Sequence, residues 1–85
     1  MTTIYKYYFQ IADRVTIEMP AAAKILCVQV QDHTPTIWAQ VDTDLGLEAK
    51  TFRIYGTGQK LDDDNYLRKY IGTIQLNGFV WHVFE

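Results

Sequence analysis

The sequence predicts a small all-β fold, or a β-rich α+β variant of it: an antiparallel sandwich or partly closed barrel of about six to seven strands. Apolar and polar residues alternate through most of the 85-residue chain, which is the pattern of strands with one buried face. Residues 62–68 look like the only helical turn. The alternating segments outnumber the strands that one open sheet would need. The pattern therefore predicts a single β-rich domain over residues 1–85.

The first two segments are predicted to form a hairpin. Residues 3–11 place Tyr5, Tyr7 and Phe9 on one face, and residues 15–19 alternate in the same way. An Asp-Arg dipeptide between the segments suits a tight turn. We therefore expect these two strands to pair with each other.

Proline then interrupts the pattern. Pro20 has no N–H to donate to a central strand ladder, so residues 20–23 are expected to form a loop or a single turn. Residues 24–31 and 36–43 follow as alternating segments, joined by the short polar sequence "DHTP". That spacing predicts a second hairpin.

Alternation within this second hairpin assigns its faces. Leu26, Val28 and Val30 share one face of the first strand, and Ile37 belongs to the core face of the second. Trp38 then points to the opposite face, among polar neighbours. Such a Trp serves either a subunit interface or a ligand platform.

The last three segments complete the predicted sheets. Residues 50–56 place Phe52 and Ile54 on one side and Arg53 and Tyr55 on the other, so we look for chemistry on the side of Arg53 and Tyr55. The segments "KYIGTIQL" and "FVWHVFE" flank an Asn-Gly pair. This pair is the strongest hairpin signal in the chain, because both residues tolerate positive φ.

Composition argues against several classes of protein. The net charge is −2 and the Lys and Arg residues are scattered, so we expect no long nucleic acid as a partner. No segment resembles a membrane span or a signal peptide, which predicts a cytoplasmic protein that does not bind membranes. Cys27 is the single cysteine and cannot form an internal disulfide. Because 14 % of so short a chain is aromatic, we expect a homo-oligomer that buries part of this surface.

A two-glycine loop follows the strand that carries Arg53. Gly56 and Gly58 permit backbone conformations in which N–H groups converge on an anion, and Thr57, Gln59 and Lys60 add side-chain donors. The spacing matches neither a phosphate loop nor a dinucleotide-binding fingerprint. The loop is therefore either a binding site for a small anion or an ordinary turn.

Neither metal binding nor catalysis is indicated. Residues 62–64 are three consecutive Asp, which lack the ligand spacing of a calcium loop and are typical of a capped helical turn. The chain has no Ser, and Cys27 lies in an apolar run, so the usual nucleophiles are missing or buried. We predict no metal, no cofactor and no catalytic residue, and hence a protein that is not an enzyme.

Several stretches resemble a family of small, mostly uncharacterised proteins from phages, prophages and bacteria. The most specific are "TFRIYGTG", residues 51–58, and the terminal "HVFE", residues 82–85, and the similarity spans essentially the whole chain. The resemblance implies a phage accessory protein acting in the host cytoplasm. Small phage proteins of this size often antagonise host defence, either by binding a defence protein or by oligomerising into sponges that sequester a nucleotide immune signal.

Two functions are therefore expected as alternatives. The first is sequestration of a small anionic ligand, with a cyclic nucleotide immune signal as the leading candidate, by an oligomer that acts as a sponge. In this hypothesis Arg53 contacts phosphate, the loop residues Gly56, Thr57, Gly58, Gln59 and Lys60 supply donors, and Tyr55 or Trp38 stacks on a base. The second is a protein-interaction module that inhibits a host defence protein or serves in phage assembly.

Overall fold

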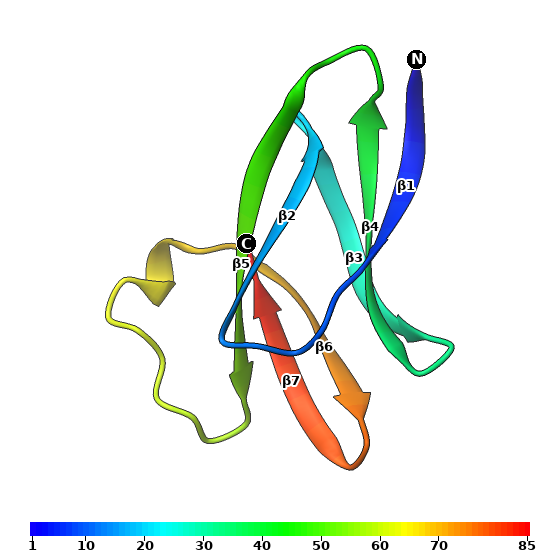
Figure 1. Cartoon of the computed structure of the whole chain (residues 1–85). Coiled ribbons are helices and arrows are strands. Elements are labelled where there is room, and N and C mark those ends of the chain that lie inside the picture. The colour runs from blue at the N-terminus through cyan, green and yellow to red at the C-terminus, as the bar shows by residue number, and fades with distance from the viewer.

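The computed structural model describes all 85 residues and confirms the all-β fold. Seven strands and one short 3-10 helix follow one another: β1 (Thr2–Tyr8), β2 (Arg14–Pro20), β3 (Lys24–Gln31), β4 (Thr34–Asp42), β5 (Leu47–Gly56), η1 (Asn65–Leu67), β6 (Tyr70–Leu76) and β7 (Phe79–Phe84). The strands form two antiparallel sheets, β1-β4-β3 and β2-β5-β7-β6 (Figure 1). They do not close into a barrel. No helix is long and apolar enough to cross a membrane.

Two tight turns form the predicted hairpins β3–β4 and β6–β7. Asp32 and His33 connect the first pair with φ values of 49° and 64°. Asn77 and Gly78 connect the second with φ values of 52° and 83°. Two successive positive φ values give the backbone twist that matches paired strands, so these turns set the register of each hairpin.

The predicted hairpin between the first two strands is wrong. β1 ends at Tyr8 and pairs with β4, whereas β2 pairs with β5 in the other sheet. The connection, residues 9–13, crosses from one sheet to the other. Its ends are held on opposite sides: the Phe9 N–H donates to Pro35 at 3.1 Å, and the Ile54 N–H donates to the Asp13 carbonyl at 3.1 Å. Because Phe9 is buried in the core, the chain crosses here instead of turning back.

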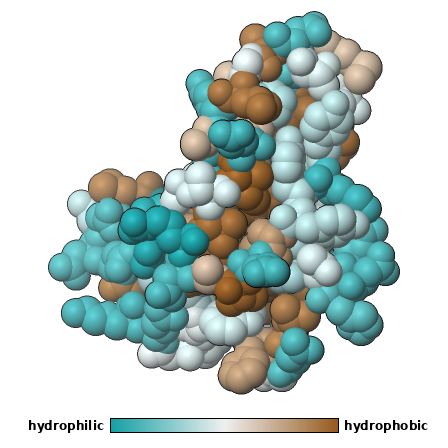
Figure 2. All heavy atoms as spheres, viewed as in Figure 1, coloured by the Kyte–Doolittle hydropathy of each residue, from teal (hydrophilic) through white to brown (hydrophobic).

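The core lies between the two sheets. Ile37 and Ala39 of β4 face Phe52 of β5 and Val83 of β7 across it, and all four are fully buried. Apolar atoms also show along the middle of the molecule in Figure 2, where the two sheets splay apart between β1 and β2. The predicted core faces of β4 and β5 are confirmed.

A β-bulge changes the face of one predicted core residue. Ile25 pairs with Ala39 and Cys27 pairs with Trp38, so Leu26 is the extra residue in β3. Leu26 is therefore 41 % exposed, while Ile25 and Val28 are buried. The prediction that Leu26 shares the core face is wrong, because strict alternation fails where an extra residue enters the strand.

Candidate functional site

The non-core face of β5 is covered by the long connection from Thr57 to Lys69. This connection leaves the end of β5, passes beside it and returns to β6 through η1 (Figure 1). Arg53 and Tyr55 do lie on the face opposite Phe52 and Ile54, as alternation predicts. They are nevertheless only 9 % and 1 % exposed.

Asp62 links the connection to β5 by binding the side chains of Arg53 and Tyr55. One oxygen of its carboxylate lies 2.7 Å from Nη2 of Arg53 and accepts a hydrogen bond of 3.0 Å from the Tyr55 hydroxyl. The Arg53 guanidinium also lies 5.3 Å from the centre of the Tyr55 ring. The Tyr55 hydroxyl, followed by the charges of Asp62 and Asp13, raises the pKa of Arg53 above its ordinary value. The guanidinium is therefore paired within the protein.

The glycine loop is a closed turn. The Gln59 N–H donates to the Gly56 carbonyl at 3.1 Å, and the Gln59 side-chain oxygen accepts the Gly56 N–H at 3.0 Å. The Thr57 N–H points to the Val80 carbonyl at 3.4 Å. Gly58 has a φ of 87°, a conformation that favours glycine, which explains why glycine occupies this position. Because most N–H groups of the loop have partners within it or in β7, the loop does not form an open cradle of donors.

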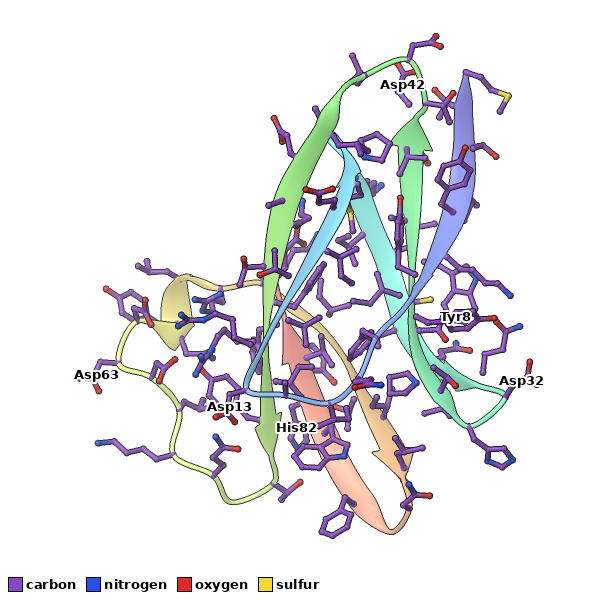
Figure 3. The ribbon with its side chains drawn as sticks, in the orientation of Figure 1. Tyr8, Asp13, Asp32, Asp42, Asp63 and His82 are labelled. Carbon is purple, nitrogen blue, oxygen red and sulfur yellow. The ribbon has the colours of Figure 1, made fainter.

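His82 joins this turn to the neighbouring strands. Its Nε2 lies 2.8 Å from the Thr57 hydroxyl, and its Nδ1 lies 3.0 Å from the Thr73 hydroxyl on β6. The Thr73 hydroxyl also bonds that of Tyr70. A neutral imidazole donates through one nitrogen and accepts through the other, and hydroxyl groups can serve either role. Figure 3 shows His82 on β7, beside β5.

A pocket of about 270 Å³ opens beside His82 on the same face of the sheet. Its aromatic wall is continuous, because the Phe84 ring meets Tyr55 edge-on at 5.8 Å and Tyr70 edge-on at 5.5 Å. The glycine turn also lines the pocket. The full lining consists of Tyr55, Gly56, Thr57, Gly58, Gln59, Leu61, Tyr70, His82 and Phe84. The site thus combines flat apolar surfaces with hydroxyl and imidazole groups.

Comparison with known proteins identifies the family. A family model described as "Domain of unknown function (DUF7352)" matches residues 1–85. The chain belongs to the DUF7352 family. The match confirms that the resemblance extends over the full length, while the family description names neither a phage source nor an anti-defence activity. A search of curated proteins and a search of solved structures found no match.

This DUF7352 chain brings some of the predicted site residues together and separates others. Tyr55 and the four residues 56–59 line the pocket. Lys60 lies next to them, on a separate depression that it lines together with Leu61, Asp62 and Asp63. Arg53 lies beneath the connection and is bound to Asp62. Trp38 is on β4 in the other sheet, opposite Lys6 and Cys27, and does not line the pocket.

Four residues of the pocket were not predicted from the sequence: Leu61, Tyr70, His82 and Phe84. His82 and Phe84 alternate along β7, so they share a face, and this signal is visible in the sequence. His82 and Phe84 lie at the pocket because β7 pairs with β5 in a register that sets His82 opposite Tyr55. That pairing is long-range and has no local sequence signature. No group of His, Cys, Asp or Glu side chains is arranged to hold a metal ion.

Proposed function

We propose that this protein binds a small anionic ligand without transforming it, as a phage accessory protein that sequesters a cyclic nucleotide immune signal in the host cytoplasm. The observation that carries the proposal is the pocket beside His82. Its aromatic wall offers flat surfaces for a nucleobase, and stacking on aromatic side chains tolerates any base. A pocket of about 270 Å³ suits one nucleotide unit more than a long polymer.

We assign to the polar residues around the pocket roles that differ from those expected from the sequence. Arg53 is bound to Asp62, so we assign the ligand's negative charge to exposed Lys60 and to the backbone at Gly58 instead. Both ring nitrogens of His82 are engaged by Thr57 and Thr73, so we assign the edge of a base or a ribose hydroxyl to the Thr57 hydroxyl, which His82 holds in place and which retains further hydrogen-bonding capacity. Tyr70, which is 54 % exposed, is the ring most accessible for stacking.

Binding fits the His82 cluster better than catalysis does. A hydroxyl next to an imidazole resembles the first two members of a nucleophilic triad. The group on the other side of His82 is the Thr73 hydroxyl, which carries no charge to stabilise an imidazolium. The chain of hydroxyls and imidazole is therefore assigned to ligand recognition.

Calorimetric titration against cyclic dinucleotides, cyclic mononucleotides and linear dinucleotides tests the proposal. We expect at least one of them to bind, and Tyr70→Ala to weaken its binding about tenfold through the lost stacking. Tyr66→Ala is the matched control, because Tyr66 lies in the connection just before β6, is 83 % exposed and does not line the pocket. The absence of heat with every ligand, or equal loss in both variants, would refute it.

A second candidate function is inhibition of a host defence protein through the tip of the β6–β7 hairpin. Phe79 is 64 % exposed there and stacks on Trp81 with ring centres 5.9 Å apart. Exposed aromatic residues of this kind often dominate the energy of protein interfaces. Pull-down from host lysate with the native protein and with Phe79→Asp tests this candidate. A stoichiometric partner retained by the native protein alone would favour it over ligand sequestration.

A further inference from the structure

The two sheets have four edge strands. Two of them pack against each other, and the other two do not. β3 and β6 lie against each other: a Cβ atom added at Gly72 would come within 2.9 Å of Val28. The other two edges, β1 and β2, border the side on which the sheets splay apart (Figure 1). A free edge presents unpaired N–H and C=O groups that can template pairing with another strand.

Hydrogen bonds at both ends of β1 show which of its residues face outward. The Met1 carbonyl accepts the Thr43 N–H, and the Phe9 N–H donates to the Pro35 carbonyl, so both residues bond toward β4. Because these directions alternate along a strand, the odd-numbered residues bond to β4 and the even-numbered ones point to the free edge. The outward positions are Thr2, Ile4, Lys6 and Tyr8.

The same reasoning shows that the free edge of β2 is protected. The Asp13 carbonyl and the Ala21 N–H both bond toward β5 or its preceding loop, so even-numbered residues again point outward. Those positions are Arg14, Thr16, Glu18 and Pro20. Two opposite charges and a proline that lacks an N–H are devices that discourage edge pairing. On β1 the single charge is Lys6, and no proline is present.

We propose that β1 pairs antiparallel with β1 of a second copy of this chain, which joins the two three-stranded sheets into one continuous sheet. An antiparallel edge is its own complement under two-fold symmetry. One register engages all four outward residues: Thr2 opposite Tyr8 of the partner subunit, and Ile4 opposite Lys6 of the partner subunit. Each such pair exchanges two N–H···O bonds.

Charge excludes a neighbouring register. Sliding the strands by two residues in one direction would place Lys6 directly opposite Lys6 of the partner subunit, where like charges repel. Sliding them in the other direction would leave Tyr8 without a partner. The proposed register also brings apolar surface together, because Ile4 is 57 % exposed, Tyr8 is 53 % exposed and Tyr5, on the symmetry axis, is 44 % exposed. Tyr8 lies on the outer side of the sheet in Figure 3.

Sedimentation analysis of the full chain tests whether the chain dimerises through the free edge of β1. We expect twice the 9.9 kDa chain mass for the native protein and the single chain mass for Ile4→Pro, which removes an outward N–H and leaves the β1–β4 bonds intact. Thr16→Pro is the matched control, because it removes an outward N–H from β2, and it should remain a dimer. A monomeric native protein, or a dimer that survives Ile4→Pro, would overturn the proposal.

Disulfide trapping tests the register and does not depend on the proline variants. In a Cys27→Ala background, Tyr5→Cys places two thiols on the symmetry axis with Cα atoms about 4.5 Å apart, which a disulfide can bridge. Thr3→Cys is the control, because its two copies would lie about 14 Å apart along the paired strands. We expect mild oxidation to cross-link Tyr5→Cys alone. Equal cross-linking of both variants, or of neither, would exclude this register. The outcome is independent of whether the pocket binds a nucleotide.

Discussion

At the scale of single residues, Arg53 shows how a neighbour far along the loop decides what a side chain can do. Alternation correctly predicts that Arg53 and Tyr55 share the face opposite Phe52 and Ile54. The expectation that this face is open to solvent considered only the alternation within β5 and not the residues that follow it. Asp62, seven residues beyond Tyr55, binds both side chains and brings the connection down over them. A residue expected to bind ligand thus holds the rim of the pocket in place.

Removing Asp62 should therefore destabilise the protein. Asp62→Ala leaves the Arg53 guanidinium and the Tyr55 hydroxyl without their shared acceptor, and Nε of Arg53 already has no hydrogen-bond partner. We expect a loss of about 1–3 kcal/mol in the free energy of unfolding, toward the lower end because water partly screens the exposed Asp62. Urea denaturation measures it.

Asp63→Ala is the matched control for this change. Asp63 is the next residue, is exposed and makes no ion pair, and Figure 3 shows it on the outer side of the connection. A surface substitution of this kind should change stability by less than about 0.5 kcal/mol. Equal losses in the two variants would mean that Asp62 does not anchor the connection.

At the scale of elements, local signals predicted the strands and two hairpins well. The Asn-Gly turn and the alternating segments around it are local features, and both appear as expected in β6 and β7. The pairing of β1 with β4 and of β2 with β5 could not be predicted in this way. It depends on residues 9–13 crossing between the sheets with Phe9 in the core, which is a property of the packed molecule. The pocket could not be predicted for the same reason, because it depends on the pairing of β5 with β7, which are separated in the sequence by the long connection and β6.

The β6–β7 turn gives a direct test of one local signal. Gly78 has a φ of 83° and no heavy atom near the position of an added Cβ, so Gly78→Ala changes backbone strain and not packing. We expect a loss of about 1–2 kcal/mol in stability, because L-residues disfavour this region. Gly46→Ala is the control, since Gly46 is equally open and lacks a positive φ. Thermal unfolding compares the two, and a Gly78→Ala variant as stable as Gly46→Ala would contradict the prediction.

At the scale of the whole molecule, the two sheets approach each other closely where β3 meets β6. Gly72 sits where β6 is irregular in its pairing, and an added Cβ would lie 2.9 Å from Cγ1 of Val28. Val28 is buried and its branched side chain has little freedom to turn away. Gly72→Ala should therefore push the sheets apart and cost about 1–3 kcal/mol.

A double-mutant cycle distinguishes this steric contact from a general weakening of the core. Val28→Ala alone should destabilise the protein by leaving a cavity, yet it also makes room for a methyl group at position 72. We therefore expect the double variant, Gly72→Ala with Val28→Ala, to lose less stability than the sum of the two single losses, by at least about 0.5 kcal/mol. Urea denaturation of all four proteins gives the coupling. Strictly additive losses would show that the approach of Gly72 to Val28 does not set the spacing of the sheets.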